Sequence, residues 1–389
     1  MNYPVSKLED CCTIIAGQSP ESKYYNFDGE GIPFFQGKAD FGDLYPTIRV
    51  YCSQPTKIAE KDDILLSVRA PVGPTNLAPC QVCIGRGLTA IRPSSQLLTG
   101  YVLMFFRFFE AQLALKGTGT TFNAITQSVV KNLEIPIPPL DEQRRIVSRI
   151  EELFSELDNS VSTLQKTKEQ LTVYRQAVLK EAFEGDYNYE PISSIAKAIG
   201  GYAFKSKMYS DSGKYIVVKI GNVKEQGFDF TRDLTKTTEC DESILEKYLL
   251  KKGDCVISLT GSRGKRDYGF VCIISNENNY LVNQRVAALR FDVNKALPEF
   301  YYYYLSSPSY RDDFFKYETG NVGQGNVGIK ALIEPMVPVP TLKQQEELVT
   351  EIESRLSVCD SIEHTVDTAL QQAEAMRQSI LKQAFEGRL

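Results

Sequence analysis

Two stretches of the chain carry glycine-bounded loops that are rich in hydrogen-bonding side chains. The first stretch offers Gln36, Lys38, Ser67, Arg69, Arg86, Thr120 and Asn123. The second offers Lys219, Asn222, Thr260, Ser262, Arg263, Lys265, Arg285, Gln324 and Asn326. Arginine and lysine suit the edge of guanine, asparagine and glutamine suit adenine, and serine and threonine suit a base or a phosphate. These residues are predicted to contact DNA. Loops are polar in most proteins, so the prediction depends on the two sets together and not on any one residue.

Patterns typical of catalysis or metal binding are weak in this sequence. His364, the one histidine, lies in a helical stretch, where a solvated position is expected. Cys80 and Cys83 have the spacing of half a zinc site, but no second Cys/His pair follows at a suitable distance. Two cysteines on a strand are expected instead. No catalytic residue and no metal site are predicted.

A glycine pattern, G-x-G-x-x-G, occupies residues 323–328 and matches the dinucleotide-binding expression. The preceding residues 314–319 are not the buried apolar strand that this motif requires. We expect a loop with a close backbone approach, and a nucleotide-dependent enzyme stays an alternative that cofactor binding would decide. Residues 261–266 resemble a phosphate loop only superficially, because the spacing differs and no Ser or Thr follows Lys265. The chain is therefore predicted to be non-catalytic, with no cofactor of its own.

The elements that must position these loops include a long repeat. Residues 136–187 align without a gap onto residues 338–389. After a proline-rich entry, residues 141–184 contain no proline or glycine and carry apolar residues every three or four positions, which is typical of a long amphipathic helix. Each helix is expected to bury its apolar stripe against the other, in the antiparallel direction. Gly185 and Gly387 fall where C-caps are expected.

The unique segments, residues 1–135 and 186–337, are weakly related to each other. Short β-branched runs between Gly, Pro and Asp predict strands and turns. Aromatic runs at 101–109 and 300–305 predict a helix in each segment. We therefore predict an α+β fold, with two similar mixed α/β domains separated by two long antiparallel helices and related by approximate twofold symmetry. The predicted order is domain, helix, domain and helix, with boundaries at 1–140, 141–185, 186–340 and 341–389.

The charge and the composition limit the class of protein. The net charge is −5, and the acidic excess lies in the repeated segments. The chain alone is therefore expected to bind a phosphate backbone weakly. It has no run of about 18 apolar residues, which a membrane span needs, and its first residues lack the pattern of a signal peptide. Nine cysteines, an odd number, are expected to be reduced thiols in the cytoplasm.

Several motifs carry a resemblance to a known family. The sequence IPPLDEQ at 137–143 enters the first long helix and LKEAFEG at 179–185 leaves it, with related copies around the second helix. Together with SVRAPVG at 67–73 and VNQR at 282–285, these motifs resemble the specificity subunits of Type I restriction–modification enzymes. The resemblance covers the whole chain. It is strong, because the order, the spacing and the duplication of the motifs all agree.

The resemblance implies two target recognition domains, each of which binds one half of a split site in double-stranded DNA. The helices would act as a ruler that sets the gap and would dock the partner subunits. Modification subunits, two in number, would bring S-adenosylmethionine and methylate adenine, and a motor-nuclease restriction subunit would bring ATP and Mg. This chain would be the DNA-recognition subunit. The second entry reads TLKQQ at 341–345 and Arg355 stands where the first copy has Leu153, so docking at the two ends is expected to differ in detail.

Two other interpretations stay open. A structural coiled-coil scaffold that binds other proteins would explain the long helices but not the duplicated glycine-bounded loops. A silent specificity gene of the same family would show every one of these sequence features.

Overall fold

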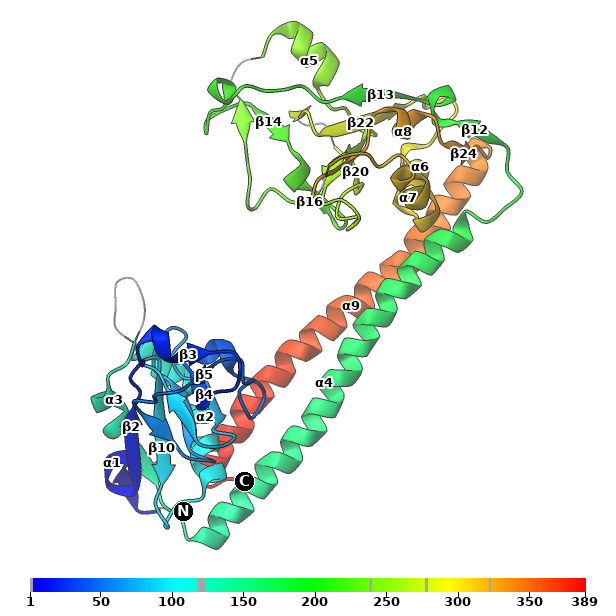
Figure 1. The fold of residues 1–389 in the computed structure, drawn as a ribbon. Helices are drawn as coiled ribbons and strands as arrows, with labels where there is room; N and C mark the ends of the chain where they lie inside the picture. Colours follow the sequence, from blue (N-terminus) through cyan, green and yellow to red (C-terminus); the bar gives the residue numbers. More distant parts are fainter. Residues whose placement is uncertain (1–2, 118–123, 238–239, 277–278, 322) are drawn as a thin grey trace. The chain divides into compact units, whose positions relative to one another are not determined.

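The computed structural model describes residues 3–117, 124–237, 240–276, 279–321 and 323–389. The chain divides into two compact units: unit 1 is Met1–Gln165 with Asp367–Leu389, and unit 2 is Lys166–Val366. Two long helices, α4 (Leu140–Ala182) and α9 (Leu342–Phe385), contribute to both units (Figure 1). Unit 1 therefore combines distant parts of the chain, whereas unit 2 is continuous.

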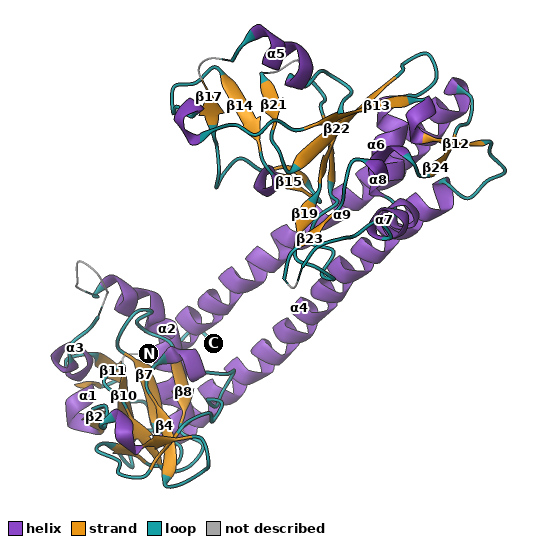
Figure 2. Cartoon of the chain, turned by 45° about the horizontal axis from the view of Figure 1, so that its top comes forward, coloured by secondary structure: helices purple, strands orange, loops and turns teal. Residues whose placement is uncertain are grey.

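The described strands of unit 1 form two sheets and a strand pair, coloured orange in Figure 2. An antiparallel sheet has the order β2 (Cys12–Ala16), β10 (Leu88–Pro93), β7 (Ile64–Ser67), β8 (Thr75–Leu77). The other sheet has the order β3 (Tyr25–Asn26), β5 (Tyr51–Cys52), β4 (Ile32–Phe35), β9 (Val82–Ile84), β6 (Ile58–Ala59), and β4 runs parallel to β9. The pair is β1 (Val5–Lys7) with β11 (Glu134–Pro136). The shorter helices are α1 (Leu8–Cys11), α2 (Thr99–Leu115) and α3 (Gln127–Lys131).

Unit 2 repeats this framework in its described residues. The antiparallel sheet has the order β13 (Ala196–Gly200), β22 (Val286–Phe291), β18 (Cys255–Ser258), β20 (Val271–Ile273). The second sheet has the order β17 (Lys236–Thr237), β14 (Tyr215–Val218), β21 (Tyr280–Val282), and β14 runs parallel to β21. The strand pairs are β12 (Tyr189–Pro191) with β24 (Met336–Pro338), β15 (Val223–Lys224) with β16 (Gly227–Phe228), and β19 (Thr260–Gly261) with β23 (Gly325–Asn326). The shorter helices are α5 (Glu242–Tyr248), α6 (Pro298–Ser306), α7 (Pro308–Phe315) and α8 (Lys330–Ile333).

The duplication therefore extends to the segments whose sequences are only weakly related. Strand β10 of unit 1 and strand β22 of unit 2 hold the same central place in the antiparallel sheets. An ion pair to a buried carboxylate recurs directly before the neighbouring strand, β7 in unit 1 and β18 in unit 2. Arg92 contacts Asp63 at 2.8 Å, and Arg290 contacts Asp254 at 2.6 Å. The predicted pair of similar mixed domains is confirmed.

An aromatic helix in each unit packs against the end of a long helix. In unit 1, Phe385 of α9 lies 5.2 Å from Tyr101 and 5.7 Å from Phe105 of α2, between ring centroids. In unit 2, Phe183 of α4 lies 5.3 Å from Phe300 of α6. Both contacts come from the same repeated motif, Ala-Phe-Glu-Gly. Aromatic burial of this kind is among the largest apolar contributions to a core, so this motif fixes each long helix to a domain.

The two long helices pair in the antiparallel direction inside each unit, as predicted. In unit 1, Arg377 of α9 contacts Asp158 of α4. In unit 2, Arg175 of α4 contacts Asp360 of α9 at 2.7 Å, and Arg355 contacts Glu181 at 2.9 Å. The first two pairs are equivalent in the repeat, because Arg175 corresponds to Arg377 and Asp158 to Asp360.

The predicted apolar seam is only partly correct. Ile352 and Cys359 are each 1% exposed, but Ile362 is 41% and Met376 53% exposed. Spacing alone does not reveal which apolar positions of the stripe stay exposed. Arg355, the residue that departs from the first copy, lies 5.6 Å from the ring centroid of Tyr174 on α4. A cation–π contact and an ion pair therefore replace a leucine in the second copy.

The two predicted glycine C-caps differ. Gly387 has φ +72°, and the N–H of Arg388 donates to the carbonyl of Gln383 at 2.8 Å, as expected for a glycine cap. The expectation for Gly185 is wrong, because α4 ends at Ala182 and Gly185 is not in the left-handed region. Its Cα faces the ring of Tyr187 instead, where an added Cβ would lie 2.6 Å from a ring carbon.

A buried glutamine ties the start of each long helix to its domain. The amide oxygen of Gln143 accepts from the N–H of Leu98 at 2.8 Å, and its Nε2 donates to the carbonyls of Gln96 and Pro138 at 2.8 and 2.9 Å. Gln345 makes the equivalent three bonds in unit 2. Both side chains are 0% exposed. This explains the glutamine of the IPPLDEQ motif.

Replacing Gln143 with methionine is expected to lower the free energy of unfolding by about 3 kcal/mol, because buried backbone groups would lose their partners. Chemical denaturation measures this loss. The matched control is Gln170→Met on the exposed face of the same helix, with a change expected within about 0.5 kcal/mol. Equal stability of the two variants would contradict the role given to Gln143.

The cysteines behave as small apolar residues. All nine are free thiols, and Cys83 lies on β9, packed with Phe34 and Cys52. Cys80 lies before that strand, so the expectation of two strand cysteines is correct only for Cys83. Burial raises the pKa of the Cys83 thiol. Among the described helices, none combines the length and the apolar character that crossing a bilayer requires.

Candidate nucleic-acid interface

Five of the predicted residues of unit 1 line one pocket of about 190 Å³: Gln36, Lys38, Ser67, Arg69 and Arg86. An adjoining pocket of about 420 Å³ shares Arg69 and Arg86. The other two predicted residues of this unit, Thr120 and Asn123, lie outside the residues that the structure describes.

The strand register explains why these residues meet. Phe35 and Ile84 are paired on the parallel strands β4 and β9, so the loops that follow them leave at the same edge and carry Gln36 and Arg86. The N–H of Val68, directly after β7, donates to the carbonyl of Gly87 at 2.9 Å and brings the third loop to this edge. Ligand sites commonly lie where strands end together in this way.

The pocket of unit 1 is electropositive. Arg69, Arg86 and Lys38 are exposed, and no ion pair with a carboxylate engages them among the described residues. On the neighbouring helix α2, burial raises the pKa of Glu110, and Lys38 opposes that rise. Two guanidinium groups that no described carboxylate pairs with suit phosphate oxygens or the acceptor edge of guanine.

Ser67 has a different part in this pocket. It is 1% exposed, and its hydroxyl lies 3.1 Å from the carbonyl oxygen of Arg69 and 2.9 Å from that of Pro71. Gly73 closes the same loop at φ +111°, with its N–H bonded to the carbonyl of Ser67 at 3.0 Å. This geometry favours a role for Ser67 in shaping the loop that presents Arg69 over direct contact with a base.

In unit 2 the equivalent edge carries a two-stranded ribbon. Thr260 on β19 stands opposite Asn326 on β23, and its hydroxyl donates to the amide oxygen of Asn326 at 2.9 Å. In unit 1 the corresponding bridge joins Arg69 to Ala124. The ribbon and its adjoining loops bring together Thr260, Ser262, Arg263, Lys265, Gln324 and Asn326. A two-stranded ribbon has the dimensions to enter the major groove of DNA.

The ribbon also shows that the glycine pattern at 323–328 is not a dinucleotide-binding turn. Gly325 is part of β23 and pairs with Gly261, so the pattern lies in a hairpin-like ribbon and not at a strand-to-helix turn. An added Cβ at Gly325 would lie 3.2 Å from the Cα of Arg263, which is the close backbone approach expected from the sequence.

The cations of unit 2 are more engaged than those of unit 1. Lys219 contacts Asp233 at 3.2 Å, and Arg263 donates to the carbonyl of Gly320 at 2.7 Å. Lys265 and Arg285 are exposed, and the described residues show no ion pair for either. The N–H of Leu259 donates to the carbonyl of Arg285 at 3.0 Å, which places Arg285 beside the ribbon.

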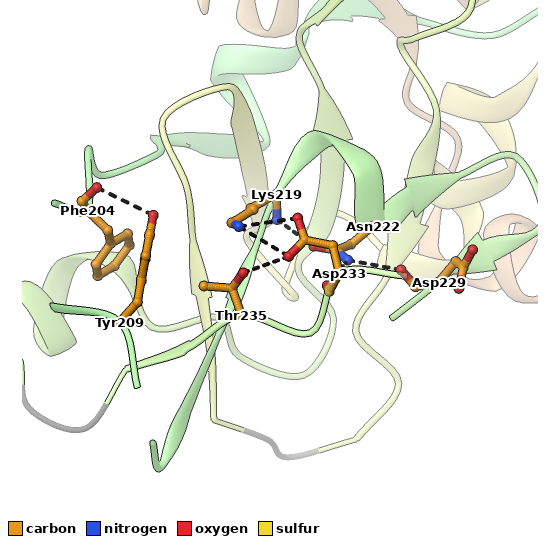
Figure 3. A network of polar contacts seen from close by, with 7 residues as sticks. All are labelled: Phe204, Tyr209, Lys219, Asn222, Asp229, Asp233 and Thr235. Atoms are coloured by element: carbon orange, nitrogen blue, oxygen red, sulfur yellow. Dashed lines mark hydrogen bonds and ion pairs between the residues drawn. The ribbon is translucent and has the colours of Figure 1, made fainter. Parts of the chain in front are cut away.

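Lys219 and Asn222 belong to a neighbouring polar network (Figure 3). Asn222 is 0% exposed; its amide oxygen accepts from the N–H of Lys219 at 2.9 Å, and its Nδ2 donates to the carbonyls of Asp229 and Asp233 at 2.9 and 2.7 Å. These bonds leave Asn222 little capacity for a base, so the geometry favours a role in holding the loop that carries Lys219. The sequence alone did not distinguish a residue that contacts a base from one that holds the loop.

Sequence reasoning missed Asp233, which positions Lys219. The hydroxyl of Thr235 donates to Asp233 at 2.6 Å, and this bond, with the ion pair to Lys219, lowers the pKa of the carboxyl. The local signal was the repeated Asp-x-Thr pattern at Asp229 and Asp233, which is typical of side chains that bond to nearby groups in turns.

Comparisons with known proteins agree on one family. The model described as "Type I restriction modification DNA specificity domain" matches residues 2–172 and again 184–372. The specificity subunit of the type I restriction enzyme EcoKI from Escherichia coli is 26% identical over 376 residues, which cover 91% of this chain and 80% of that protein. A Methanocaldococcus jannaschii protein described as the specificity subunit of the type I enzyme MjaX is 38% identical over 173 residues, but the match spans only 44% of this chain and 40% of the relative.

Solved structures give similar matches. The HsdS subunit from Thermoanaerobacter tengcongensis is 48% identical over 40% of this chain and 38% of that chain, with a TM-score of 0.37. The S subunit of the Type-I system of M. genitalium is 17% identical and covers 99% of this chain and 96% of that chain, with a TM-score of 0.40.

Proposed function

Since the chain belongs to the family of Type I restriction–modification DNA specificity domains, we propose that it is the non-catalytic subunit that recognises DNA sequence for such an enzyme. The observation that carries the proposal is the repetition of one strand framework with different side chains at the same edge. Unit 1 presents Arg69 and Arg86 there, whereas unit 2 presents Thr260, Asn326 and Arg285. Two unlike edges suit two different short sequences, and hence a bipartite site. The family match disfavours the alternative of a structural scaffold.

The division of labour along the chain follows from this proposal. Residues 1–140 and 186–340 would each bind one half-site of double-stranded DNA, and residues 141–185 and 341–389 would set the gap between them. Modification subunits, two in number, would methylate adenine with S-adenosylmethionine, and a restriction subunit would use ATP and Mg. Because the net charge of this chain is −5, those partners would supply much of the attraction for phosphate.

Methylome sequencing tests the proposal. A host that carries the partner modification gene is expected to show methylated adenines in one bipartite motif when this gene is present. The motif is expected to vanish when the gene is deleted and to return on complementation. Persistence of the same motif after deletion would refute the proposal.

A further inference from the structure

The loop between β19 and β20 in unit 2 has an unusual backbone. Gly264 has φ +74°, which glycine adopts readily, but Arg266 has φ +52°. A side chain in this left-handed region is uncommon, and such a conformation persists only where the surroundings hold it. The same loop exposes Arg263 and Lys265, both candidates for contact with DNA.

Helix α7 supplies one set of the contacts that hold this loop. The guanidinium of Arg311 donates to three backbone carbonyls in succession: Nη1 to Gly269 at 2.8 Å, and Nη2 to Arg266 and Tyr268 at 2.9 and 3.1 Å. One side chain therefore satisfies three carbonyls of the C-terminal half of the loop, including that of the left-handed residue Arg266.

Aromatic rings keep this guanidinium in place. The guanidinium carbon of Arg311 lies 4.9 Å from the ring centroid of Phe270 and 5.4 Å from that of Phe315. Burial lowers the pKa of Arg311 from its usual value, because the charged group has lost water. From the same helix, Asp312 binds the side chain of Arg266 at 2.6 Å. Two residues of α7 thus bind Arg266: Arg311 binds its carbonyl, and Asp312 binds its side chain.

A second contact fixes the other side of the loop. One carboxylate oxygen of Glu318 accepts from the hydroxyl of Tyr268 at 2.8 Å and from the N–H of Gly264 at 3.4 Å. Arg263 itself donates to the carbonyl of Gly320 at 2.7 Å. The loop is therefore held on both sides by α7 and by the segment that follows it.

We propose that Arg311 is a positioning residue for recognition of the second half-site: it fixes the backbone of residues 266–269, so that the loop presents Arg263 and Lys265 in one geometry before DNA arrives. This inference rests on the proposed function. In unit 1 the corresponding loop is short and is held by Ser67 and Gly73, with no comparable arginine among its described residues. The effect of Arg311 is therefore confined to one half-site.

The test uses the full chain co-expressed with its modification subunits and a library of randomised DNA, from which bound molecules are selected and sequenced. Arg311→Met is expected to reduce discrimination at the second half-site about tenfold, because the loop side chains must then be ordered on binding. Discrimination at the first half-site stays unchanged. Arg311→Lys keeps the charge but not the three-way fork and is expected to fall between wild type and Arg311→Met. Glu318→Gln, a milder change on the other side of the loop, gives a second reading if Arg311→Met folds poorly.

The control is Arg290→Met on β22, which removes an arginine that also makes three hydrogen bonds, two to Asp254 before β18 and one to the carbonyl of Leu249. It is expected to lower the melting temperature and to leave both half-sites intact. Unchanged discrimination in Arg311→Met and Glu318→Gln would overturn the inference, and so would equal loss at both half-sites. If the wild-type complex selects no bipartite sequence, the proposed function itself fails, and this inference fails with it.

Discussion

Replacing Arg69 and Arg86 together with alanine is expected to weaken binding to the first half-site at least about a hundredfold, because each bidentate contact to guanine contributes about 1–3 kcal/mol. Both guanidiniums line the same pocket, and the described residues offer neither of them a carboxylate. Their full charge is therefore available to DNA. The measurement is a binding titration of the complex with its modification subunits on DNA that carries both half-sites.

The matched control removes the same charge from the same unit. Arg144 and Arg149 are exposed on α4, where each pairs with a carboxylate of its own helix. Alanine at both positions is expected to change affinity by less than about threefold, since exposed ion pairs of this kind contribute little. Arg285→Ala in unit 2 is expected to relax the second half-site alone. Equal losses in the pocket variant and the helix variant would indicate that Arg69 and Arg86 act only through net charge.

A matched insertion in the two long helices is expected to lengthen the gap between half-sites by about two base pairs. Four added residues extend a helix by about 6 Å, and successive base pairs are about 3.4 Å apart. The insertions belong after Ser160 in α4 and after Glu374 in α9. Insertions at these two positions keep both interhelical ion pairs. Asp158 and Arg377 both lie on the unit 1 side of the insertions, and Arg175 and Asp360 both lie on the unit 2 side.

The control for this experiment is the insertion after Ser160 alone, which lengthens one helix without its partner and is expected to impair assembly. Methylome sequencing reports the gap directly. The ruler model requires the same two half-sites at a greater separation in the matched variant. An active matched variant with the original gap would exclude the helices as the element that sets it.

The parts of the fold that could be predicted are those that local sequence controls. Residues 141–184 lack proline and glycine, and the structure has a helix over Leu140–Ala182. Gln36, Arg69 and Arg86 each follow a strand, and strands that end at one edge bring their following loops together. The grouping of these residues around the pocket of unit 1 could therefore be predicted from the sequence.

The parts that could not be predicted depend on contacts between distant residues. Asn222 and Lys219 look alike as loop residues, but only Asn222 is buried, and its acceptors belong to Asp229 and Asp233. Arg311 bonds to backbone carbonyls, which any residue would offer, so no pattern marks it. Ile362 fits the apolar spacing and is nevertheless 41% exposed.

Unit 1 is built from two segments far apart in the chain, and this affects its folding during synthesis on the ribosome. Unit 2 is one continuous stretch, Lys166–Val366, whereas unit 1 needs Asp367–Leu389 to cover the aromatic face of α2. At roughly ten residues per second, the nascent first lobe would wait on the order of twenty seconds for Phe385 to emerge. Unit 2, although it is translated later, is therefore the first that can mature, and the aromatic face of α2 stays without its cover until Phe385 emerges.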